Sequence, residues 1–474
     1  MPYKTCHLGL KLQRMFVFPI IYIALFIASL YFLKERQPNG IFLFILFGLP
    51  IYTLSLSVSH LYGFTKMVPV LQTFKEITIL SFLVYALSQL KTGNNWQTLD
   101  KIMLAFFCYN LLYVPLPVGG YSFFERVLAF KSLSFFPLVY FTGRIIKSEQ
   151  IELTKVFHYI AILTLIAAGV LLIELITYTH IQTISGYAGY NQYFFEQDPS
   201  GTYDLSWTFE IENGMKRFAS IFSTPLELAA ASLISLAAIA AIVTNRDNSY
   251  SFTKLSAVAL LGSFFCINFA LSRASLASYM LMLYCYAWFT NKKVILKTIH
   301  YAFITAVAVL VFISFESDFV DFIINSVTFT NASSVGHLIE WANGLESMIK
   351  SPLGIGLGSS GRISAFSGYN VGGENEFIII GVQTGVIALG LYIAAYVYLI
   401  KKTYQIFTTS EGRIRRLALF LLLLKIGLII PLFTSEAESY IYVSYTTWFL
   451  SGIFINMCSK EGRTNKTEGI HELI

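Results

Sequence analysis

A polar, glycine-rich segment at residues 334–378 holds the largest group of side chains suited to chemistry. Its candidate residues are His337, Trp341, Arg362, Glu374, Asn375 and Glu376. Packing has little need of such residues in a loop, and polar groups gathered on a rigid scaffold usually bind or react. The carboxylate of Glu374 could accept a proton from a substrate hydroxyl, and His337 is the competing base. We therefore expect the functional site here, with Glu374 as base and the other five residues as binding residues.

Two arginines outside this segment are candidates for binding an anion. Arg217 follows a long polar stretch in GMKRFASIFSTP, where its guanidinium could either reach lipid headgroups or grip a phosphate. Arg273 lies in ALSRASL, where two apolar segments meet with almost no loop. An arginine held at membrane depth is costly and marks a functional site by default, although a salt bridge or a helix cap is the structural alternative.

The polar stretch at residues 179–224 is rich in aromatic rings and carboxylates. Its rings are Tyr187, Tyr190, Tyr193, Phe194, Phe195, Tyr203, Trp207 and Phe209, and its acids are Glu196, Asp198, Asp204, Glu210 and Glu212. Rings flanked by carboxylates suit a sugar, whose C–H face packs on a ring while its hydroxyls seek acceptors. An interfacial aromatic belt, or plain packing of the loop, is the alternative.

The composition predicts an all-α polytopic membrane protein. Of 474 residues, 55% are hydrophobic and 13% charged, against about 25% charged in ordinary soluble domains. Apolar blocks have the length of membrane-spanning helices, the structure that satisfies backbone polar groups in lipid. The candidate spans are 15–33, 41–59, 70–90, 102–118, 127–146, 156–178, 225–243, 255–271, 275–289, 294–315, 377–400, 417–433 and 440–458.

Charge distribution predicts how these spans are oriented. Basic clusters near Lys292 and Lys401 belong in the cytoplasm under the positive-inside rule, which also accounts for the net charge of +6 without nucleic acid. Residues 179–224 and 316–376 are then two large extracytoplasmic loops, separating helical regions 1–178, 225–315 and 377–474. Thirteen spans would place the basic N-terminus outside, against the same rule, so we expect one early segment to be re-entrant or merged, leaving about twelve.

Several other features carry no chemistry. The five cysteines show no metal or disulfide spacing, and we expect no metal and no cofactor. The first apolar run lacks a small-residue cleavage site and reads as a retained span. The GLGSSG run at residues 356–361 formally fits a dinucleotide fingerprint but lacks the strand and helix of a βαβ unit. We expect its glycines to let the backbone turn and approach a ligand closely.

Four motifs in order resemble the O-antigen ligase/polymerase family of bacterial membrane glycosyltransferases. They are RFASIFSTP, ALSRASL, SVGHLIEWANGLESMIKSPLGIGLG and GENEFIIIGVQTGVIALGL, together covering residues 216–391. The resemblance implies a GT-C-like helical fold in a bacterial plasma (inner) membrane. It also implies that Arg217 and Arg273 act on the lipid pyrophosphate. Many members have arginine where His337 stands, and ligases have histidine where Glu374 stands, so this chain resembles a polymerase with a carboxylate base.

The implied reaction is polymerisation of polysaccharide repeat units at the outer face of the membrane. The growing glycan would leave its polyprenyl pyrophosphate and join a lipid-linked repeat unit, with a flippase and a chain-length regulator as partners. A ligase or a protein O-oligosaccharyltransferase of the same family is the first alternative. A transporter is the second, for which Lys425, deep in an apolar segment, is the main candidate residue.

Overall fold

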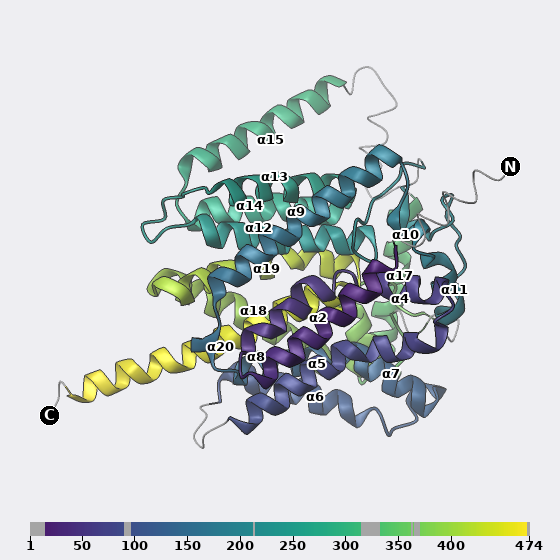
Figure 1. Ribbon diagram of the computed structural model, residues 1–474, viewed down its shortest axis with the longest axis horizontal. Coiled ribbons are helices and arrows are strands. Elements are labelled where there is room, and N and C mark those ends of the chain that lie inside the picture. The colour runs from purple at the N-terminus through teal and green to yellow at the C-terminus, as the bar shows by residue number, and fades with distance from the viewer. Residues whose placement is uncertain are drawn as a thin grey trace.

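The computed structural model describes residues 15–89, 96–211, 214–313, 332–361, 364 and 370–471. Within these ranges the regular secondary structure is helical, and β-type pairing is limited to two isolated bridges. Long helices lie side by side in a bundle, while the short helices α10 and α11 gather with α17 at one end (Figure 1).

The first six predicted segments are all helical. They correspond to α2 (Val17–Lys34), a bent pair (Pro38–Gly48 and α4, Tyr52–Leu61), α5 (Val68–Ser88), α6 (Thr98–Leu112), α7 with α8 (Phe123–Ser134, Phe136–Ile145) and α9 (Leu153–Thr177). The first large loop holds α10 (Ile181–Ile184) and α11 (Tyr187–Phe195).

The remaining seven predicted segments are helical as well. They correspond to α12 (Pro225–Val243), α13 (Lys254–Phe269), α14 (Arg273–Phe289), α15 (Lys293–Ile313), α18 (Glu376–Thr409), α19 (Gly412–Thr434) and α20 (Ile441–His471). The second large loop holds α17 (Ala332–Lys350), and a short turn, η8 (Ala437–Ser439), joins α19 to α20.

Six helices in the described ranges are long and apolar enough to cross a membrane. They are α2, Thr65–Ser88, α9, α12, α18 and α19, and the bent pair makes a seventh if it is one span. This supports a helical membrane protein, whereas the finer count of twelve to thirteen spans stays a prediction.

The irregular early segment is the bent pair, whose two helices meet at 61°. At its start, the Asn39 amide donates to the Gln150 carbonyl at 2.8 Å, just before α9. At its end, the His60 ring lies 5.0 Å from the Tyr193 ring, beyond α9. The 25 residues of α9 span about 37 Å. The two ends of the bent pair therefore contact segments that precede and follow α9, and whether the pair is a broken span or a re-entrant loop stays a prediction.

The start of α2 lies at the same end as the first large loop. The Phe16 ring packs against Tyr62 and Phe64, with centroids 5.2 and 5.6 Å apart. The predicted reduction from thirteen spans to about twelve rested on the side of the basic N-terminus, and it stays a prediction. The basic residues Lys4, Lys11 and Arg14, which argued for twelve, lie outside the described residues.

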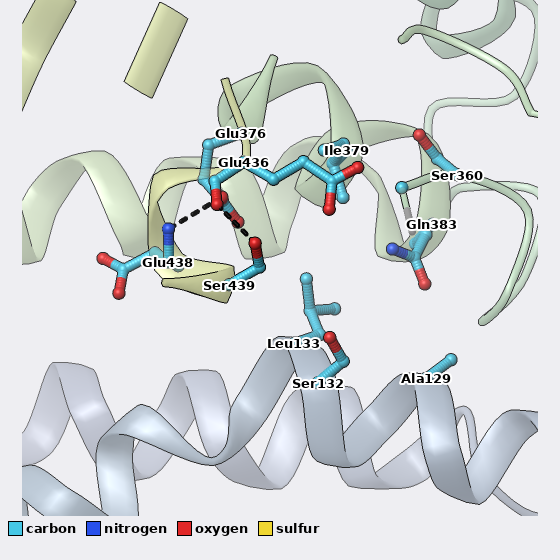
Figure 2. Close-up of a pocket in the computed structure, with 11 residues that line it drawn as sticks. Ala129, Ser132, Leu133, Ser360, Glu376, Ile379, Gln383, Glu436, Glu438 and Ser439 are labelled. Carbon is cyan, nitrogen blue, oxygen red and sulfur yellow. Dashed lines mark hydrogen bonds between the residues drawn. The ribbon is translucent and has the colours of Figure 1, made fainter. Parts of the chain in front are cut away.

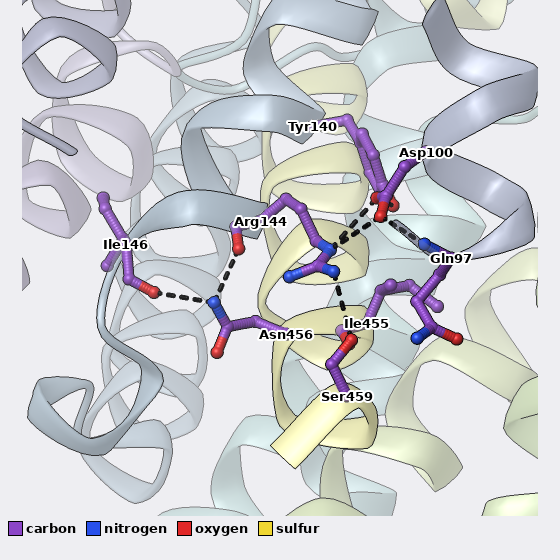
Figure 3. A network of polar contacts seen from close by, with 8 residues as sticks. All are labelled: Gln97, Asp100, Tyr140, Arg144, Ile146, Ile455, Asn456 and Ser459. Atoms are coloured by element: carbon purple, nitrogen blue, oxygen red, sulfur yellow. Dashed lines mark hydrogen bonds and ion pairs between the residues drawn. The ribbon is translucent and has the colours of Figure 1, made fainter. Parts of the chain in front are cut away.

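At the opposite end of the bundle, a buried polar network ties α6, α8 and α20 together (Figure 3). The Arg144 Nε donates to Asp100 Oδ1 at 3.0 Å, and both side chains are 4% exposed. Tyr140 donates to the same oxygen at 2.6 Å, and a second guanidinium nitrogen of Arg144 donates to Ser459 at 3.1 Å. The network holds these three helices together at the end of the bundle away from the two large loops.

Candidate functional site

The glycine run of the second large loop inserts into a break in α18. Gly385 breaks the helix with φ +84° and ψ 179°. Backbone groups freed by the break pair with the loop: Ile355 N donates to Val382 O at 2.8 Å, and Val386 N donates to Pro352 O at 2.9 Å. The loop is thereby fixed to a rigid element instead of lying free on the surface.

The same glycines approach protein backbone very closely. A Cβ at Gly356 would lie 2.3 Å from the Val118 carbonyl oxygen, and one at Gly354 would lie 2.6 Å from the Gln383 oxygen. The sequence led us to expect close approach to a ligand. In the structure, this run is packed on α18 and the loop after α6.

Arg217 is held against the turn that carries Arg273. Its Nε donates to the Ala270 carbonyl at 3.1 Å, and its backbone N donates to Phe209 O at 2.8 Å. Ala270 caps the end of α13, and Arg273 is the first residue of α14, where Ser272 caps the helix. The side chain of Arg273 is exposed and that of Arg217 is half-buried.

Electrostatics join Arg217 to two other predicted site residues. Burial is the largest cause that lowers the pKa of Arg217, and the positive charge of Arg273 lowers it further. Tyr440 and Glu374 act in the opposite direction. We call Arg217, Arg273, Glu374 and Tyr440 the outer cluster. The two guanidinium groups thus act on each other's charge, and an anion placed between them would relieve that repulsion.

At the start of α18, the side chains of Glu374, Asn375 and Glu376 point in different directions. Glu374 is exposed and belongs to the outer cluster. Asn375 is 3% exposed and caps α18, its Oδ1 accepting from Phe377 N at 3.0 Å and Ile378 N at 3.2 Å. Glu376 is 6% exposed and accepts from the backbone N of Glu438 at 3.2 Å. The structure thus gives Asn375 a capping role, and Glu376 turns inward.

Glu376 lines a small acidic cavity, shown in Figure 2. Its lining residues are Ala129, Ser132, Leu133, Ser360, Gly361, Glu376, Ile379, Gln383, Glu436, Glu438 and Ser439. The volume is about 30 Å³, which is room for about two water molecules. Glu376 and Glu436 lie across the cavity from α7, whereas the carboxylate of Glu438 points away from it (Figure 2). The acidic cavity and the outer cluster flank the same two segments, 374–376 and 436–440.

The other predicted binding residues lie on α17 or beyond it. His337 Nδ1 lies 3.7 Å from Glu340 Oε2 as an i,i+3 pair. Trp341 packs with Met348, Ile378 and Val382, which gives it a packing role under α18. Arg362 lies outside the described residues. A Cβ at Gly373 would touch Glu340, so α17 lies against the residue that precedes Glu374.

In the first large loop, many of the rings are used for packing. Tyr187, Tyr190 and Phe209 are at most 3% exposed. Two rings, Tyr193 at 64% and Trp207 at 63%, are exposed. The core of this loop also contains His180. Burial, and to a smaller extent the positive charge of Lys216, lowers the pKa of His180 to about 4.

Three residues near the site were missed in the sequence: Glu436, Glu438 and Tyr440. The signal was present, because SEAES places two glutamates in a short outer turn between apolar segments. We had treated that turn only as a connection. Among the residues that the structure describes, no three His, Cys, Asp or Glu side chains are placed to bind one metal ion.

Comparison of the chain with known protein families found no matching family model, and comparison with curated proteins found no match either.

Proposed function

We propose that the protein is a membrane glycosyltransferase that polymerises polysaccharide repeat units (O-antigen, capsule or exopolysaccharide). Its substrates are oligosaccharides linked to polyprenyl pyrophosphate at the outer face of a bacterial plasma membrane. One observation carries the proposal. Arg217 donates to the Ala270 carbonyl in the turn before Arg273, and the charges of Arg273 and Glu374 both act on it, although the three residues come from separate parts of the sequence.

The proposed chemistry follows from the charges of these three residues. A sugar hydroxyl of the incoming repeat unit attacks the anomeric carbon of the growing glycan, and Glu374 takes the hydroxyl proton. The bond from that carbon to the pyrophosphate oxygen breaks, and the electron pair leaves with the lipid pyrophosphate. Arg217 and Arg273 stabilise this leaving anion, and a preorganised donor of this kind contributes about 2 to 4 kcal/mol.

The arginines are tested with purified protein and a lipid-linked repeat unit, read out as a ladder of chain lengths. We expect Arg273→Ala and Arg217→Ala to abolish the ladder while protein level stays normal. Arg273→Lys should recover poorly, because the planar fork of donors is lost. Arg246→Ala is the control, since that arginine is exposed and pairs with Glu411. A full ladder from Arg273→Ala contradicts the proposal.

The base is tested by replacing each candidate separately. Glu374→Gln keeps shape and hydrogen bonding but removes basicity, so unpolymerised repeat-unit lipid should accumulate. His337→Ala should keep part of the activity, because His337 lies beside Glu340 on α17 and is proposed to bind substrate, not to act as the base. The reverse outcome, an active Glu374→Gln and an inactive His337→Ala, assigns the base to the histidine.

The side of the membrane is tested by cysteine labelling in a background without native thiols. Ser200 and Ala342 are exposed positions in the two large loops, and Thr408 is exposed at the other end of α18. Cysteines at the first two should react with an impermeant maleimide in intact cells, and one at Thr408 only after lysis. The reverse pattern puts the site in the cytoplasm and removes the lipid-linked mechanism.

Transport of lipid-linked glycan is the second candidate function. Two observations favour it, the broken helix at Gly385 and the buried charge of Lys425. A transporter moves repeat-unit lipid across vesicles without lengthening it, whereas a polymerase yields the ladder. A ligase or protein O-oligosaccharyltransferase instead transfers glycan to lipid A core or to protein. A flippase and a chain-length regulator are the partners that the polymerase requires in cells.

A further inference from the structure

Lys425 is a buried lysine that the proposed reaction does not use. It is 0% exposed, and its amino group makes no hydrogen bond to the residues that the structure describes. It lies nine residues before the end of α19, about 13 Å along the helix. A charge at such depth is costly and requires compensation.

Aromatic rings and one carboxylate supply that compensation. The Lys425 Nζ lies 3.4 Å from the centroid of the Trp448 ring and 4.2 Å from that of Tyr396. The indole Nε1 of Trp448 donates to both oxygens of Glu438, at 3.0 and 2.9 Å. The ring therefore stands between a cation on its face and a carboxylate on its edge.

Glu438 is held by hydrogen bonds from two helices. Besides Trp448, its oxygens accept from the Tyr392 hydroxyl on α18 and the Ser444 hydroxyl on α20, each at 2.7 Å. Both carboxylate oxygens therefore face hydrogen-bond donors, which is the arrangement that suits an acceptor-only group. The side chain that could supply the opposite charge is Lys425, on the far side of the Trp448 ring.

We propose that Lys425 and Glu438 form one buried ion pair bridged by the Trp448 indole, and that Lys425 is a positioning residue for the turn at 436–439. A cation on the π face attracts the ring electrostatically. It also polarises the N–H toward the carboxylate, as linked polar groups strengthen one another in a low dielectric. Removing either charge leaves the other buried and uncompensated.

The pair connects the bundle interior to the candidate site. The backbone N of Glu438 donates to Glu376 Oε2 at 3.2 Å, and Glu436 and Glu438 line the acidic cavity. Tyr440, two residues further on, belongs to the outer cluster. A displaced turn moves all of these groups together. This consequence for catalysis rests on the proposed function, whereas the ion pair itself does not.

A double-mutant cycle tests the pair without substrate. The variants are Lys425→Met, Glu438→Gln and the two together, with Lys425→Arg as the charge-conserving variant. We expect each single change to lower the Tm in detergent by at least about 3 °C, and the double change to cost less than the sum. Lys155→Met with Glu152→Gln is the matched control, an exposed pair that should show no coupling. Additive Tm losses overturn the ion pair.

Kinetics with the lipid-linked repeat unit test the positioning role. Lys425→Met and the double variant should lower kcat by at least about tenfold, because small misplacements are costly, while KM changes little. Lys425→Arg should recover much of the loss. A double variant as active as the wild type overturns the positioning role. A wild type without polymerase activity but with coupled Tm losses leaves the ion pair standing and rejects only the proposed reaction.

Discussion

Replacing Arg144 is expected to be among the most destabilising single changes in the chain. Asp100 and Arg144 are each 4% exposed in their side chains, and Arg144 Nε lies 3.0 and 3.2 Å from the two carboxylate oxygens. Arg144→Met fills the space but leaves Asp100 buried without its cation. Breaking a buried ion pair in this way costs about 3 to 5 kcal/mol.

The chain offers an exposed ion pair as an internal control. Arg246 and Glu411 also form a salt bridge, but their side chains are 76% and 66% exposed. Solvent screens such a pair, so Glu411→Gln should cost less than about 1 kcal/mol. The buried and exposed changes should therefore differ by at least about 2 kcal/mol.

The cost of both changes is measured as the free energy of unfolding in mixed micelles. A double variant of the buried pair completes the cycle. Arg144→Met combined with Asp100→Asn should cost less than the sum of the two single changes, because no uncompensated charge then remains. A loss for Arg144→Met no larger than that for Glu411→Gln refutes the reasoning that burial sets the strength of this pair.

Three further predictions concern the loops and the broken helix. Gly385→Ala should destabilise the protein by about 2 kcal/mol or more, measured by unfolding, since its φ and ψ are nearly restricted to glycine and a Cβ would lie 2.4 Å from Pro352 O. Asn375→Ser should keep stability and activity, because serine also caps a helix, whereas Asn375→Ala should lower the free energy of unfolding by about 1 kcal/mol. A stable but inactive Asn375→Ser variant would show that the amide binds substrate. The lowered pKa of His180 predicts stability that is complete above pH 6.5 and falls as pH drops toward 4, by about 3 kcal/mol in all. His180→Phe should flatten that part of the stability profile.

The sequence by itself determined the class of protein and the position of its helices. Long apolar blocks in lipid can satisfy their backbone only as helices, so each predicted segment falls on helix in the structure. Proline at the start of α12 and Ser272 before α14 are local signals, readable without any tertiary contact. The placing of Arg273 and Glu374 at helix starts, and of Arg217 in the loop before α12, also followed from the sequence.

Other features depended on contacts between distant residues. Nothing local distinguishes Asp100 and Arg144 from ordinary charges near a membrane surface, because their partnership spans 44 positions. Likewise, Asn375 reads as a binding residue in sequence and as a helix cap in the structure.

Only the tertiary structure decided what the glycine run and the turn at 436–439 do. Gly354 and Gly356 are free to approach any surface, and the break at Gly385 supplies the backbone groups that they meet. Glu438 lies in a short polar connection along the chain, and packing of α18, α19 and α20 surrounds it with donors and a buried lysine. Local sequence sets which segments are helical, because backbone pairing is local. Which polar side chains meet is set by helix packing over long separations.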